Sequence, residues 1–109
     1  MRPIVVTTSD ASGGTKNSTP VIMDYFGNPN VSLQVVVTGS ATWTVQQTLD
    51  NPNAQGVTPT WFNHPDPSMV TQTVNRQSNY AYVPVAVRLQ QTAGAGSAVL
   101  TVVQAGLNQ

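Results

Sequence analysis

The chain contains one histidine, and it lies in the segment that carries most of the side chains capable of chemistry. His64 stands between Asn63 and Pro65, with Asp66 two residues further on. A histidine that a carboxylate orients can act as a general base. Residues two apart in a proline-bounded loop seldom hold that geometry, however, and no Gly-x-Ser-x-Gly nucleophile motif accompanies them. We therefore expect a hydrogen-bonding, structural role for His64 and predict that the protein is not an enzyme.

The composition also gives little support for a bound metal or cofactor. Zinc prefers clustered Cys and His ligands, whereas this chain has one His and no Cys. Calcium takes six to eight oxygens, usually from several carboxylates. Asp50, Asn51, Asn53 or Asp66 could each supply one, but the spacing of an EF-hand is missing. Paired carboxylates for glycoside hydrolysis are not expected from four Asp and no Glu, and we predict no metal and no cofactor.

Aromatic side chains in the same segment point to binding instead. Trp61 and Phe62 are neighbours, so in an extended segment their side chains point to opposite sides, and one can anchor the loop while the other stays exposed. An exposed aromatic ring can fill a pocket on a partner protein, as interface hot spots do, or stack on a sugar. We predict that Trp61, Phe62 and His64 form a partner-binding site. Replacing Trp61 with Ala should then weaken assembly with little change in melting.

The charge count excludes several kinds of partner. Charged residues make up 7% of the 109 residues, four basic and four acidic, and the net charge is zero. Nucleic-acid binding requires a basic surface that displaces counterions, and a polybasic membrane patch is absent for the same reason. No apolar run approaches the roughly 18 residues of a membrane span, and the apolar stretch at 3–7 is too short for a signal peptide. Because near-zero net charge promotes association, we expect a protein that works in an assembly, as a homo-oligomer.

The elements that must position these side chains are strands. Residues 31–38 and 41–48 alternate apolar and polar side chains, and Gly39-Ser40 between them predicts a two-residue hairpin turn. Residues 85–91 and 97–104 predict a second hairpin around the glycine-containing turn at 92–96. Weaker strands are predicted at 4–8, 21–25, 70–74 and 80–83, and no stretch has helical periodicity.

Strands that recur every 8–12 residues are typical of a sandwich or barrel. The sequence therefore predicts an all-β fold, a single antiparallel β-sandwich of about eight strands over residues 1–109, with a jelly-roll as one arrangement.

Residues 1–20 are expected to include an extended arm that reaches a neighbour, and 105–109 are a second choice for such an arm. Tyr80 and Tyr82 are expected on one face, and the proline-rich loop at 50–68 is expected to be ordered. The predicted core comprises Leu33, Val35, Trp43, Val87, Leu89 and Leu100.

Three stretches carry a resemblance: ATWTVQQTLDNP (41–52), TWFNHP (60–65) and YAYVPVAVRLQQTAGAGSAVLTVVQAG (80–106). They resemble small Val/Thr-rich virion proteins of tailed bacteriophages, and the likeness covers most of the chain from about residue 31 onward. Within that group the nearest role, by size and low charge, is capsid decoration. The resemblance implies a cement protein on the head surface of the virion, in contact with the major capsid protein and with copies of itself. The alternatives are a carbohydrate-binding module of a tail tip or fibre, and a tail or head–tail connector subunit.

Overall fold

The computed structural model describes residues 3–23, 30–56, 58–80 and 83–104. The predictions for Tyr82 and for 105–109 lie outside this part of the chain. The described residues form β-strands joined by loops and one short 3-10 helix. The elements are β1 (Ile4–Ser9), β2 (Lys16–Asn17), β3 (Val21–Ile22), β4 (Val31–Thr38), β5 (Thr42–Thr48), β6 (Phe62–Asn63), η1 (Pro67–Met69), β7 (Arg76–Tyr80), β8 (Ala86–Ala93) and β9 (Ser97–Gln104).

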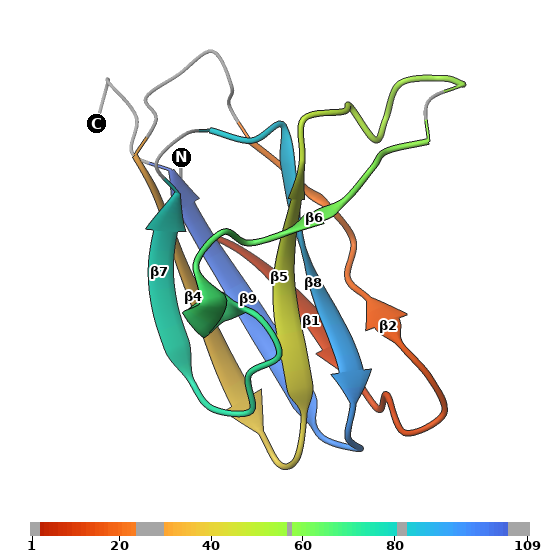
Figure 1. The fold of residues 1–109 in the computed structure, drawn as a ribbon, viewed down its shortest axis with the longest axis vertical. Helices are drawn as coiled ribbons and strands as arrows, with labels where there is room; N and C mark the ends of the chain where they lie inside the picture. The colour runs from red at the N-terminus through yellow and green to blue at the C-terminus, as the bar shows by residue number, and fades with distance from the viewer. Residues whose placement is uncertain (1–2, 24–29, 57, 81–82, 105–109) are drawn as a thin grey trace.

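The strands form two antiparallel sheets that pack face to face, so the predicted β-sandwich is confirmed (Figure 1). One sheet has the strand order β1-β9-β4-β7, and we call it sheet A. The other has the order β2-β8-β5-β6, with β3 also paired to β8, and we call it sheet B.

The strand pairs are nested along the chain. β1 pairs with β9, β3 with β8, β4 with β7 and β5 with β6. The pairs β4–β9 and β5–β8 then join these four pairs into the two sheets. The chain is therefore arranged like one long hairpin, with strands near the start pairing with strands near the end.

Both predicted hairpins are wrong, because each turn carries the chain from one sheet to the other. β4 belongs to sheet A and β5 to sheet B, and likewise β8 belongs to sheet B and β9 to sheet A. Alternation shows which side chains are buried, but it is the same whether two strands lie side by side or face each other across the core. The apolar faces of β4 and β5 meet across the core instead of forming one surface.

Glycines allow these two turns to pack against each other at one end of the sandwich. Gly96 N–H donates to the Ser40 carbonyl at 2.7 Å. A Cβ atom on Gly94 would overlap the backbone of Ser40, and one on Gly96 would overlap the Thr38 carbonyl. Gly94 also has a φ of +95°, a conformation that L side chains rarely adopt. Gly39-Ser40, which predicts a hairpin turn, therefore forms a turn that packs closely against the turn between β8 and β9.

The core lies between the two sheets, and all six predicted core residues are buried in it. Trp43 and Val45 of β5 point inward from sheet B, whereas Leu33 and Val35 of β4 point inward from sheet A. Met69 of η1 is also buried and closes one side of the core.

The described part of the N-terminal segment at 1–20, where an arm is predicted, belongs to the sandwich. Residues Ile4–Ser9 pair with β9 along their whole length, and Lys16–Asn17 pair with β8. The described part of this segment thus forms edge strands of its own fold, and its contact with a neighbour stays a prediction. Of the strand predicted at 80–83, Tyr80 ends β7, and 81–82 lie outside the described residues. The range 70–74 holds no strand but a single bridge between Gln72 and Trp43.

Candidate interaction site

The loop after β5 returns across sheet B and is fixed there by backbone hydrogen bonds. β6 pairs antiparallel with β5, placing Phe62 opposite Gln47. The His64 N–H donates to the Val45 carbonyl at 2.8 Å. At the other end of the loop, Thr60 N–H donates to the Asp50 carboxylate at 2.9 Å. In Figure 1 the segment that carries β6 crosses in front of β5, so this described part of the loop lies over sheet B.

Trp61 anchors this crossing segment to β8. The Arg88 guanidinium carbon lies 4.4 Å from the centre of the Trp61 ring, a distance at which a cation and an aromatic face attract each other. Arg88 Nε also donates to Gln46 Oε1 at 2.9 Å, and Gln46 Nε2 donates to Asn63 Oδ1 at 3.0 Å. Burial lowers the pKa of Arg88. Trp61 is half-buried in this network, so it holds the loop in place.

His64 is buried in the isolated chain, and its contact with a partner stays a prediction. Its Nδ1 accepts a hydrogen bond from the Asp66 N–H at 2.9 Å, so Nε2 carries the proton and donates to the Asn79 carbonyl at 3.0 Å. The ring also packs 4.3 Å from that of Tyr80. Loss of hydration lowers the pKa of His64, because burial disfavours the charged imidazolium. His64 therefore joins the loop to the edge of β7 as a neutral side chain, the structural role predicted for it.

Asp66 does not orient His64 through its carboxylate. Asp66 Oδ1 accepts from the Ser68 N–H at 3.0 Å and caps η1, whereas Oδ2 accepts from the Ser78 hydroxyl at 3.0 Å. These hydrogen bonds lower the pKa of Asp66, those from Ser68 most strongly. Both oxygens thus serve local structure, and the histidine–carboxylate pair lacks the geometry of a general base with its orienting group.

Two large apolar side chains remain exposed beside this anchored loop. Phe62 is 62% exposed and Leu49 is 70% exposed. They border a hollow of about 390 Å³, whose walls also include Thr48, Asp50 and Thr60. We call Leu49, Phe62 and the hollow between them the apolar rim. Of the two neighbouring aromatics, Trp61 is therefore the anchor and Phe62 the exposed ring.

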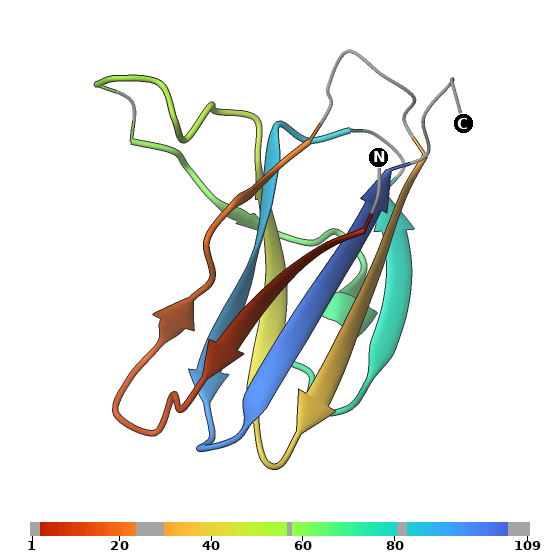
Figure 2. The same cartoon turned by 180° about the vertical axis from the view of Figure 1, so that it is seen from behind.

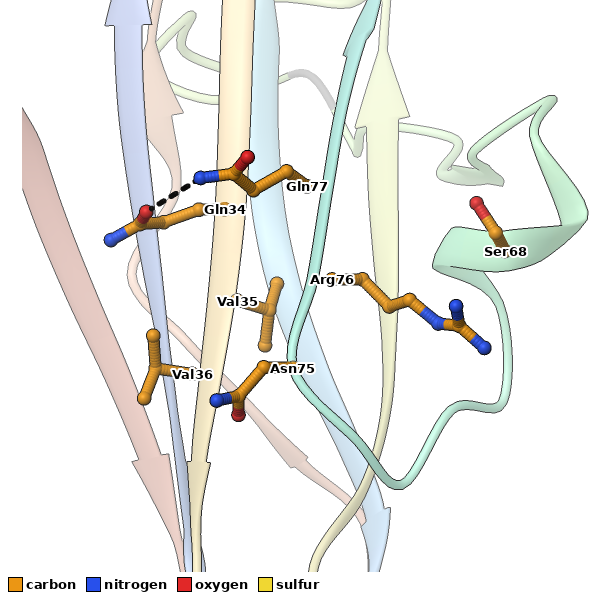
Figure 3. Close-up of a pocket in the computed structure, with 7 residues that line it drawn as sticks. All are labelled: Gln34, Val35, Val36, Ser68, Asn75, Arg76 and Gln77. Atoms are coloured by element: carbon orange, nitrogen blue, oxygen red, sulfur yellow. Dashed lines mark hydrogen bonds between the residues drawn. The ribbon is translucent and has the colours of Figure 1, made fainter.

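A larger hollow, of about 500 Å³, lies near the start of β7, but its polar groups do not converge (Figure 3). Gln34, Val36 and Asn75 lie to one side of β7, whereas Arg76 and Ser68 lie to the other. Arg76 Nε donates to Gln72 Oε1 at 3.3 Å, outside the set that lines the hollow.

The oxygen-rich stretch at 50–53 forms a turn. Asn51 Oδ1 accepts from the Asn53 N–H at 3.0 Å, and the Asn51 carbonyl accepts from the Ala54 N–H at 3.1 Å. Within residues 3–23, 30–56, 58–80 and 83–104, no three His, Cys, Asp or Glu side chains form a group that could hold a metal ion.

The comparisons with known proteins supply no family for the chain. No protein-family model matches it, and no curated protein is significantly similar to it. Over the described ranges, no helix is long and apolar enough to cross a membrane.

Sequence reasoning identified Phe62 but missed Leu49. Leu49 follows the last residue of β5 and precedes the turn at 50–53. An apolar residue between a strand and a polar turn is a weak signal, because it can equally close the core. Its place beside Phe62 follows only from the return of the loop across β5.

Proposed function

We propose that this protein is a non-enzymatic structural component of a phage particle, a capsid decoration protein that binds the major capsid protein through its apolar rim. The observation that carries this proposal is the exposure of Leu49 and Phe62 on a segment fixed to a rigid sheet. A protein-protein contact that buried both would gain roughly 1.5–3 kcal/mol for each side chain. Many copies on one lattice would add such modest contacts into firm attachment.

Two further features support this proposal. Three stretches of the sequence resemble phage virion proteins, and the low charge suits packing among other subunits. We also infer that the nested strand pairing is a jelly-roll, an architecture used by viral capsid and lectin domains. The fold by itself does not fix a role, so the apolar rim carries more of the argument.

A second candidate function is carbohydrate binding at a tail tip or fibre. The observation that favours it is that Asp50 lines the same hollow as the exposed Phe62; Asp50 Oδ2 accepts from the Thr60 N–H, which leaves Oδ1 for a ligand. A ring that stacks on a sugar and a carboxylate that accepts hydrogen bonds from hydroxyl groups are a common pairing of polar and apolar contacts in ligand sites.

The proposal is tested by adding purified protein to particles of the source phage that lack it. Replacing Phe62 with Ala should weaken binding at least about tenfold, corresponding to about 1.4 kcal/mol. Val74→Ala is the matched control, because Val74 is 49% exposed and lies outside the apolar rim. It should bind like the wild type.

Equal binding by the Phe62→Ala variant would overturn the assignment of the rim. Binding to a glycan array that depends on Phe62, without binding to particle heads, would favour the carbohydrate module. Binding confined to the tail would favour the connector or fibre.

A further inference from the structure

The outer face of sheet A is bare, and it differs sharply from the outer face of sheet B. In Figure 2, which views the molecule from behind, β1, β9 and β4 lie nearest the viewer, and no described segment crosses in front of them. Sheet B, in contrast, is crossed by the segment with β6 and carries the cation of Arg88 under Trp61.

The side chains that point outward from the described sheet A strands are uncharged. Arg76 of β7 is exposed, but its side chain lies on the other side of that strand from Gln34 (Figure 3). Buried and outward residues alternate along β9 and most of β4, and the register places outward residues of neighbouring strands in rows across the face. One row joins Val5, Thr101, Gln34 and Gln77. The outward positions hold only Val, Thr, Ser, Gln and Asn. Val5 is 57% exposed and Val36 is 39% exposed, so apolar and hydrogen-bonding groups are mixed over this face. A hollow of about 460 Å³, whose walls include Gln34, Gln77 and Thr101, lies within the face.

We infer that this face binds the same face of a second copy of the chain, forming a back-to-back dimer. A neutral surface offers a charged partner no steering, whereas two copies of it meet without like-charge repulsion. Its amides and hydroxyls are both donors and acceptors, so they can pair with themselves across a two-fold axis. Gln77 Nε2 already donates to Gln34 Oε1 at 3.3 Å within one copy, which shows that such amides pair on this surface.

The area of the face indicates a dimer of low affinity. Four strands about 4.8 Å apart and roughly seven residues long cover roughly 450 Å². Two copies would bury about 900 Å², close to the lower limit of about 1,000 Å² for a specific interface. The dimer should therefore be weak, with a dissociation constant above about 1 µM, and it should form wherever copies are concentrated.

Thr101 gives the most direct test, because it lies on the inner strand β9 between Val5 and Gln34. Close to a two-fold axis a residue meets its own copy, so Thr101→Lys should bring two cations together and abolish the dimer. Thr92→Lys is the matched control, since Thr92 is exposed on β8 of sheet B. Sedimentation equilibrium from about 1 µM to about 1 mM covers the expected range. Thermal melting would check that each variant folds.

The wild type and the Thr92→Lys variant should pass from monomer to dimer over this range, whereas Thr101→Lys should stay a monomer. An equimolar mixture of the Thr101→Lys and Thr101→Glu variants should restore the dimer, because unlike charges then meet. If Thr101→Lys does not fold, Gln34→Lys on β4 tests the same row. A wild type that stays monomeric at about 1 mM, or a Thr101→Lys variant that still dimerises, would overturn the inference. Because this experiment uses the chain alone, its failure leaves the proposed attachment to a capsid untouched.

Discussion

Gln91 holds together the end of the sandwich where the turns meet. Its side chain is completely buried. Its amide nitrogen donates to the carbonyls of Gly94 and Gly96 at 3.0 Å, and to that of Ala93 at 3.4 Å. Its amide oxygen accepts from the Thr8 hydroxyl at 2.9 Å. One side chain therefore links β1 to the turn between β8 and β9.

Replacing Gln91 with Leu keeps nearly the same volume and removes this whole set of hydrogen bonds. Each bond contributes about 1 kcal/mol net, and a buried hydroxyl that loses its acceptor costs about 1–3 kcal/mol. After this replacement the Gly94 carbonyl still accepts from the Ala11 N–H, and the Gly96 carbonyl still accepts from the Asp10 N–H. The main cost therefore falls on the Thr8 hydroxyl and on the lost amide bonds. We expect a loss of about 2–4 kcal/mol in the free energy of unfolding.

Urea denaturation measures this loss directly. With a slope of about 2 kcal/mol per molar urea, the midpoint should fall by about 1–2 M. Gln90→Leu is the control on the same strand. Gln90 is only half-buried and makes one exposed bond to Asn17, so its loss should stay within about 0.5 kcal/mol.

A double-mutant cycle separates the bond to Thr8 from the rest. Thr8→Val should cost about 1 kcal/mol in the wild type and almost nothing in the Gln91→Leu background, because the partner is already gone. If Gln91→Leu is no more costly than Gln90→Leu, the reasoning that this amide fastens the turns is wrong.

Three other perturbations test the fold. Gly94→Ala should cost at least about 2 kcal/mol through its positive φ and its contact with the neighbouring turn; Gly13→Ala, which meets open space, should be nearly neutral in the same melting experiment. Trp43→Ala should cost about 3–5 kcal/mol by leaving a cavity in the core, and a loss below about 1 kcal/mol in urea denaturation would contradict its central position. The pKa of His64 is lowered from 6.5 in the folded state. As the pH falls, the imidazole is therefore protonated in the unfolded chain before it is protonated in the folded protein. Stability should thus fall as pH drops below about 6.5 and level off once the pH is below the folded pKa. Urea midpoints from pH 8 to about pH 5 should show this fall in the wild type and not in the His64→Gln variant.

Much of the fold could be predicted from the sequence, because alternating polar and apolar residues directly report burial on a strand. β4, β5, β8 and β9 lie close to the predicted ranges, and the predicted core residues are buried. The partners of those strands could not be predicted. Gly39-Ser40 suits a hairpin turn, yet it crosses between sheets because Gly94 and Gly96 let a second turn pack onto it.

The candidate site was predictable in part for a similar reason. Adjacent aromatics in an extended segment must point to opposite sides, so one anchor and one exposed ring follow from Trp61 and Phe62 alone. Which of the two is exposed depends on Arg88, which is distant in sequence. The burial of His64 likewise depends on the Asn79 carbonyl and the Tyr80 ring of β7, contacts that no local pattern reports.

The proposed dimer and the apolar rim are compatible with each other. The dimer uses the outer face of sheet A, whereas the rim lies at the loop that crosses sheet B. A back-to-back pair would therefore present two rims at once. Two linked sites bind a repeating lattice more firmly than one.

The most direct test of the central claim is the location of the chain in purified particles of its source phage. Immunogold labelling with an antibody against the chain should place gold over the whole surface of the head, as expected for a decoration protein. Gold confined to the tail would contradict capsid decoration. No labelling of intact particles, with the chain also absent from their denatured proteins, would contradict a role in the virion altogether.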